Sequence, residues 1–205
     1  MNVFRKSPLV LLLILFFAGA VVPVSAYRLV YREQLYQLYR RQMYQTPTRI
    51  AENIYWLEQA LASDFANPLY ALARISDNRE WEWYRYLFTM HINLLLVEQY
   101  LQWSNQFMKH EAFFYNAPWQ RQNLESLDRA EELLEFARVH WREAERWSQA
   151  AMPMRFINLE GIQYWEDQHH RIRSGDLNYD RIIDRHLDRL VEVRGVFERM
   201  GPDTY

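Results

Sequence analysis

The sequence contains no cysteine, so it can form neither a disulfide framework nor a lipid-modified N-terminal cysteine. Glycine is also scarce, with five among 205 residues. Lysine occurs only as Lys6 and Lys109, so arginine supplies 22 of the 24 basic residues. Two explanations of this arginine excess stay open: a codon bias of the genome, or selection for interfaces that use forked ion pairs and ring stacking.

Beyond residue 26 the sequence has no apolar run long enough to span a bilayer, so the N-terminal segment stands apart. Arg5 and Lys6 give it a positive start, residues 9–20 an apolar core, and Val24 to Ala26 a small-residue cleavage site. We expect residues 1–26 to be a signal peptide cleaved after Ala26, which would make the protein periplasmic. The alternative is an uncleaved membrane anchor formed by residues 9–24.

Cleavage would leave residues 27–205, a length that suits one domain with a sizeable core. Those residues include 22 basic and 26 acidic side chains, a net charge of about −4 with neutral histidines. This acidic balance argues against a nucleic-acid-binding protein. Apolar residues recur every three or four positions, which predicts an all-α fold built as an antiparallel helical array or bundle.

Prolines, glycines and capping residues divide this part into expected helices at residues 29–45, 49–62, 68–75, 78–115, 119–151, 154–173 and 179–200. Asp77 and Glu80 have the spacing of a capping box at the start of the fourth helix. Residues 86–97 of that helix are apolar on nearly every side, which indicates a central helix lying antiparallel to helix 119–151. His91 and Asn93 in this run need buried partners, for which Arg85, Glu82 or a tyrosine of a facing helix would serve.

Two patterns approach metal sites. Glu166 and His169 form a Glu-x-x-His pair like those of carboxylate-bridged dimetal bundles, but the sequence holds one copy, so we interpret the pair as a solvated polar face. Asp176, Asn178 and Asp180 match positions one, three and five of a calcium loop whose glycine and closing glutamate are missing. Helix capping by Asp176 or Asn178 explains this pattern better, and we predict no metal and no cofactor.

No catalytic set emerges either. Glu125 and Ser126 resemble the glutamate–serine pair of lysozyme-like lytic transglycosylases, but the glycine-rich segment of that active site is missing. A simpler interpretation pairs Glu125 with Arg121 or Arg129 across one helical turn. The sequence also lacks GxSxG, HExxH and phosphate-binding glycine motifs. We therefore expect a protein without enzymatic activity.

Charged and aromatic residues suggest where partners would dock. The last expected helix carries acidic and basic rows that include Asp184, Arg185, Asp188 and Arg189, which form either a self-compensated solvated face or a docking stripe for a partner helix. Tyr115 and Trp119 flank the proline break between the two long helices, where a large ring is hard to enclose. We take these six residues as candidate partner-binding residues.

The spacing of small residues and the overall composition of the chain suggest two family resemblances. Ala137, Trp141 and Ala144 resemble the second helix of a tetratricopeptide repeat. Together with the N-terminal segment and the runs Leu61 to Pro68 and Phe113 to Trp119, the chain resembles the spirochaete periplasmic flagellar-collar proteins with tetratricopeptide-like helices. That resemblance implies a structural role around the periplasmic motor and transfers no functional residue.

Two functions remain open. The first is a periplasmic scaffold or adaptor that contacts other envelope proteins through residues such as Trp, Tyr and Arg. The second is a module that binds a glycan or another envelope ligand on aromatic rings. A flat aromatic patch would favour the scaffold, and a deep cleft lined by Trp, Asp and Arg would favour the ligand-binding module.

Overall fold

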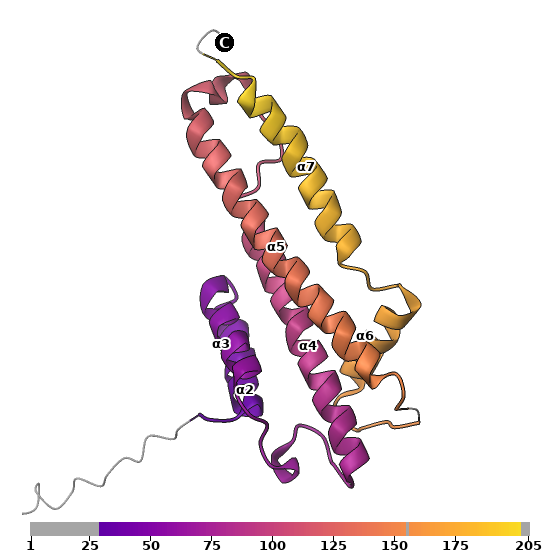
Figure 1. Cartoon of the computed structure of the whole chain (residues 1–205). Helices are drawn as coiled ribbons and strands as arrows, with labels where there is room; N and C mark the ends of the chain where they lie inside the picture. Colours follow the sequence, from indigo (N-terminus) through magenta and orange to yellow (C-terminus); the bar gives the residue numbers. More distant parts are fainter. Residues whose placement is uncertain (1–28, 155, 202–205) are drawn as a thin grey trace, which may run out of the picture.

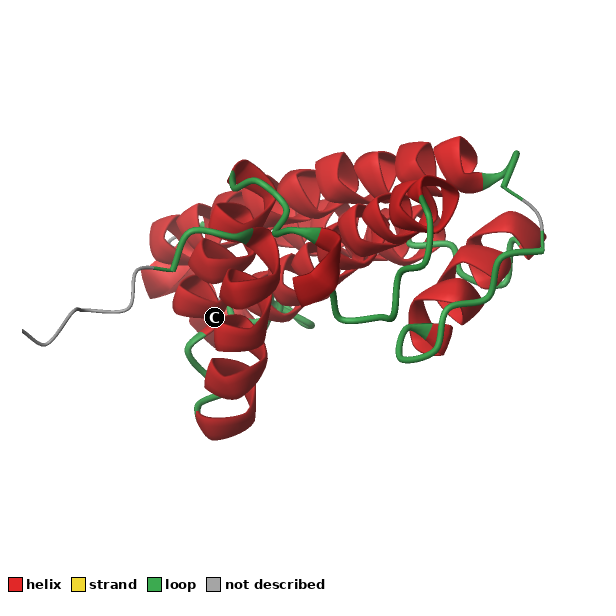
Figure 2. Cartoon of the chain, turned by 90° about the horizontal axis from the view of Figure 1, so that it is seen from below, coloured by secondary structure: helices red, strands yellow, loops and turns green. Residues whose placement is uncertain are grey.

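The computed structural model describes residues 29–154 and 156–201, so the expected signal segment 1–26 lies outside the described residues. Within them the secondary structure is helical throughout, which confirms the predicted all-α class (Figure 2). The elements are α2 (Arg32–Gln45), α3 (Ile50–Ala62), η1 (Pro68–Tyr70), α4 (Asn78–Ser104), η2 (Phe114–Trp119), α5 (Gln120–Ala151), α6 (Gln163–Ser174) and α7 (Asp180–Glu198). Among these described helices, none is long and apolar enough to cross a membrane.

The two longest helices, α4 and α5, run antiparallel and pack against each other along much of their length (Figure 1). In α5, the small residues Ala137 and Ala144 are fully buried, as is Trp141 between them in the sequence. Leu94 of α4 is also fully buried. The predicted central hairpin is therefore confirmed, and α4 is buried on nearly every side because other helices surround it.

The remaining helices cover this hairpin from different sides. Helices α2 and α3 pack against each other, and α3 lies on α4 (Figure 1). Helix α7 packs against α5, and the short helix α6 contacts both α4 and α5. Because α3 and α5 both rest on α4, a furrow floored by α4 separates them.

Two predicted helix ends are confirmed by their hydrogen bonds. Asp77 Oδ1 accepts from the backbone N of Glu80 at 2.8 Å, and the Glu80 carboxylate accepts in return from the backbone N of Ser76 at 2.6 Å. At the end of α6, Gly175 adopts the left-handed conformation with φ of 81°. Glycine reaches that conformation without steric cost, so it stops the helix after Ser174.

The helix predicted at 78–115 is too long, since α4 ends at Ser104. Residues 105–113 are a turn and an irregular segment. Tertiary hydrogen bonds hold this segment: Ser126 Oγ donates to the carbonyl O of Phe107 at 2.8 Å, and Arg189 donates to the carbonyl O of His110. The end of the helix is thus set by contacts with α5 and α7, which no local sequence signal reveals.

Two further predicted helices are also shorter than expected. The segment 68–75 forms only the single turn η1, and α6 begins at Gln163 where we had placed a helix from 154. Gly161, with φ of 95°, marks the loop before α6. A Cβ added there would lie 3.0 Å from the carbonyl O of Leu72, so this loop is packed closely on the chain near η1.

Candidate ligand-binding cleft

The furrow between α3 and α5 is a cleft of about 710 Å³ whose floor is α4. One wall comes from the start of α2, the end of α3 and the segment after it, and the other from the second half of α5. Its lining combines positive charge with aromatic rings and polar groups: Arg32, Leu61, Phe65, Arg85, Tyr86, Thr89, Asn93, Val139, His140, Glu143, Arg146 and Trp147.

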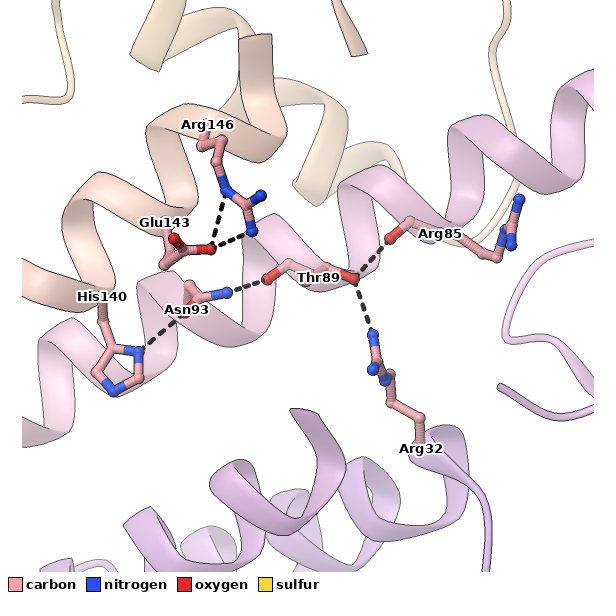
Figure 3. A network of polar contacts seen from close by, with 7 residues as sticks. All are labelled: Arg32, Arg85, Thr89, Asn93, His140, Glu143 and Arg146. Atoms are coloured by element: carbon pink, nitrogen blue, oxygen red, sulfur yellow. Dashed lines mark hydrogen bonds and ion pairs between the residues drawn. The ribbon is translucent and has the colours of Figure 1, made fainter. Parts of the chain in front are cut away.

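Arg32 joins the first wall to the floor. Its Nη2 donates to the carbonyl O of Leu61 at 2.7 Å and its Nε to the carbonyl O of Ser63 at 3.1 Å, at the end of α3 where carbonyls lack helical partners. Its Nη1 donates to Thr89 Oγ1 at 3.0 Å (Figure 3), and the guanidinium stands 4.3 Å from the centre of the Phe65 ring. Burial lowers the pKa of Arg32, and the negative charges of Glu33 and Asp64 oppose that shift.

The floor is a chain of hydrogen bonds that continues from Thr89 into α5 (Figure 3). Thr89 Oγ1 donates to the carbonyl O of Arg85 at 2.9 Å, and Asn93 Nδ2 donates to the carbonyl O of Thr89 at 2.9 Å. Asn93 Oδ1 then lies 2.9 Å from His140 Nδ1. Because an amide oxygen can only accept, His140 donates from Nδ1. Burial lowers the pKa of His140, which keeps its ring neutral at pH 7.

The second wall carries the other charges. Arg146 donates from Nε to the Glu143 carboxylate at 3.1 Å and stands 4.8 Å from the centre of the Trp147 ring. The rings of Trp147 and Tyr86, both in the lining, lie 5.8 Å apart and are tilted by 37°. Arg85 of α4 is exposed, with its guanidinium 5.9 Å from the Trp81 ring. Three arginines thus share the cleft with one glutamate, whose charge Arg146 already pairs.

Of the residues predicted to bind partners, Trp119, Asp184, Arg185, Asp188 and Arg189 have described side chains, and none of these five lines the cleft. Trp119 is 54% exposed at the junction of η2 and α5, as its position at the proline break suggested. The side chain of Tyr115 lies outside the described structure.

The charged row on α7 is only partly self-compensated. Asp184 pairs with Arg138 of α5 at 2.7 Å, and Arg185 donates to the carbonyl O of Arg181. Within α7 itself, the described ion pairs include Arg189–Glu192, three residues apart. Asp188 is exposed. Two of these charges therefore tie α7 to its neighbours: Asp184 to α5, and Arg189 to the segment after α4.

The Glu166–His169 pair is not the solvated face we expected. His169 is buried with its Nδ1 2.9 Å from Ser148 Oγ of α5. Glu166 accepts from the backbone N of Leu159 at 2.9 Å and from Trp83 Nε1 at 3.3 Å. The pair thus fastens α6 to α4 and α5. Within the described ranges, no group of three or more His, Asp or Glu side chains is placed to hold a metal ion.

Other local interpretations are confirmed. Asn178 Oδ1 accepts from the backbone N of Arg181 at 3.1 Å, so it satisfies an N–H group in the first turn of α7 from the position before the N-cap residue Tyr179. Glu125 pairs with Arg121 at 3.4 Å.

His91 finds a tyrosine partner on another helix, as predicted: its Nε2 lies 2.9 Å from the Tyr36 hydroxyl and its Nδ1 2.7 Å from Gln168 Oε1. The expected alternatives, Glu82 and Arg85, are not its partners, since Glu82 instead accepts from Tyr86.

The fold is all-α with a central antiparallel hairpin, and a cleft whose lining includes three arginines lies beside that hairpin. Residues 79–200 match DUF8513, a domain of unknown function, and the chain belongs to this family. The match covers α4 to α7, while α2 and α3, which complete the cleft, precede it. Comparison with curated proteins and with solved structures gave no match.

Proposed function

We propose that this protein is a non-enzymatic ligand-binding module of the cell envelope, and that the ligand enters the cleft between α3 and α5. The observation that carries the proposal is the cleft itself: a concave site of about 710 Å³ in which cationic, polar and aromatic side chains from three helices meet. Its size falls in the range of small-molecule sites. The cleft meets part of the criterion set by the sequence, a deep cleft lined by Trp, Asp and Arg: its lining includes Trp147 and three arginines, but its acidic residue is Glu143 instead of an aspartate. This composition favours a ligand over a flat protein contact.

The hydrogen bonds of the cleft support binding rather than catalysis. The Thr89 hydroxyl donates to a backbone carbonyl, so no base activates it as a nucleophile. The Nδ1 of His140 is bound to Asn93, and Glu143 is bound to Arg146. Side chains fixed in this way give a preorganised surface, which lowers the entropic cost of binding.

The envelope location of the proposal rests on the expected signal segment at residues 1–26. A role as a scaffold or adaptor is the second candidate, favoured by the exposed Trp119 ring at the end of the hairpin. The resemblance to flagellar-collar proteins makes the periplasmic motor the first place to look for such partners.

Native mass spectrometry of the protein purified from its own envelope tests the ligand-binding proposal. Val139 lines the cleft and is 54% exposed, so Val139→Trp should fill the cleft without disturbing the core. Val191 on α7 is 64% exposed and provides the matched control Val191→Trp. We expect a bound molecule on the wild type and on Val191→Trp, and none on Val139→Trp. A wild type without bound mass, or equal bound mass on both variants, would refute the proposal.

A further inference from the structure

The balance of charge in the cleft is opposite to that of the chain. The whole sequence has a net charge of −2, and several arginines elsewhere in the fold pair with carboxylates, as in Arg49–Glu52, Arg121–Glu125, Arg129–Glu132 and Arg194–Glu131. The cleft departs from this pattern, because its described lining contains Arg32, Arg85 and Arg146 but only the carboxylate of Glu143. Its formal charge is therefore +2 with His140 neutral.

The excess positive charge of the cleft destabilises the protein without ligand, and Arg32 contributes to this cost. The three hydrogen bonds of its guanidinium go to uncharged oxygens, those of Leu61, Ser63 and Thr89. A guanidinium has five N–H groups, so one on each Nη remains for a ligand. Burial without a contacting carboxylate disfavours the charged form, and an anion placed in the cleft would offset that loss.

The aromatic lining specifies the rest of the ligand. The Phe65 ring lies 4.3 Å from the Arg32 guanidinium on one wall, while the rings of Tyr86 on the floor and Trp147 on the other wall lie 5.8 Å apart. These rings offer apolar surface beside the charged groups, and a cleft lined by one sign of charge concentrates ions of the other sign. A ligand that uses both features carries an anionic group next to an apolar or ring-bearing portion.

We infer that the cleft binds a small organic anion, a carboxylate or a phosphate ester attached to an apolar or aromatic group. This inference rests on the proposed function, because it assigns the ligand class of the same site. The guanidinium group of arginine binds planar carboxylates and tetrahedral phosphates through paired hydrogen bonds. The two kinds of anionic group would therefore be recognised by the same chemistry.

Isothermal titration calorimetry with three probes tests the ligand class. The probes are 3-phenylpropionate, phenyl phosphate and the neutral 3-phenylpropanol. We expect at least one anion to bind about tenfold more tightly than the neutral alcohol, because hydrogen bonds to charged groups contribute about that factor. The affinity should fall as salt is added. The anion that binds more tightly shows whether the cleft prefers a carboxylate or a phosphate.

Two variants with opposite expected effects on anion affinity distinguish recognition of charge from damage to the cleft. Arg85→Gln removes an exposed cation and should weaken anion binding by about threefold. Glu143→Gln removes the competing carboxylate, releases Arg146 and should tighten anion binding by about threefold, as expected for a partly exposed ion pair. The matched controls are Arg121→Gln and Glu125→Gln, which break a pair at the other end of α5 and should leave binding unchanged.

The outcomes keep this inference distinct from the proposed function. If neither anion binds more tightly than 3-phenylpropanol, or if Arg85→Gln and Glu143→Gln bind the anions as the wild type does, the anion inference is wrong. A native ligand that is still lost in Val139→Trp would then leave the proposed function standing. Anion binding that rises in Glu143→Gln and falls in Arg85→Gln supports the inference.

Discussion

Acidification should destabilise the protein through its buried histidines, and His91 gives the sharpest case. Its ring is 3% exposed, and burial lowers its pKa from 6.5 to about 4. Between these two values the unfolded chain binds a proton that the folded chain refuses, so stability falls as the pH drops from about 6.5 towards 4. At pH 5 the loss from this one group is about 2 kcal/mol, taking 1.36 kcal/mol per pH unit.

The assay is urea denaturation followed by circular dichroism at pH 7 and pH 5. The variant His91→Gln keeps a polar side chain but cannot titrate, so its stability difference between the two pH values should be about 2 kcal/mol smaller than that of the wild type. His169, whose pKa burial also lowers to about 4, keeps some acid sensitivity in every variant. Equal pH dependence of the wild type and His91→Gln would refute the reasoning.

Three further predictions concern the hairpin and its ends. Leu94→Ala should cost about 2–5 kcal/mol in urea denaturation because it opens a cavity at a fully buried site, whereas exposed Leu69→Ala should cost little; similar costs would contradict the packing described. Asp77→Ala should lower stability by about 1 kcal/mol through loss of the α4 cap, and an unchanged melting temperature would show that the cap contributes nothing. Trp119→Ala should keep the melting temperature but lose partners in a crosslinking pull-down from envelope extracts if the scaffold role is correct; strong destabilisation would instead place Trp119 in the core.

Helix starts and stops could be predicted where a residue type has a local physical effect. Asp77 accepts a backbone hydrogen bond that only the first turn of a helix offers, and Gly175 reaches a left-handed conformation that other residues avoid. The end of α4 at Ser104 had no such signal, because the following residues include neither glycine nor proline. Arg189 of α7 and Ser126 of α5 hold the segment after α4 by hydrogen bonds. Local sequence patterns do not show that these two helices pack near that segment.

The cleft could not be predicted for a related reason. Periodicity shows which face of a helix is apolar, but it does not show which helices become neighbours. Arg32, Arg85 and Arg146 come from three helices, and each by itself looks like an ordinary surface arginine. The signals that could be found were the polar residue Asn93 inside an apolar run and His140 on the facing helix, which the structure joins by a hydrogen bond in the floor of the cleft. The charged row of α7 gave a stronger pattern in sequence, yet Asp184 and Arg189 serve contacts within the fold.

Site-specific photocrosslinking in the native envelope tests most directly that the cleft is the binding site. A photoreactive phenylalanine analogue replaces Val139 at the cleft, Trp119 at the end of the hairpin, or Val191 on α7, all exposed positions. Irradiation followed by mass spectrometry then shows which position forms an adduct with the bound molecule. The cleft account predicts an adduct from position 139 and none from position 191. An adduct from position 119 or 191, with position 139 unreacted, would contradict it.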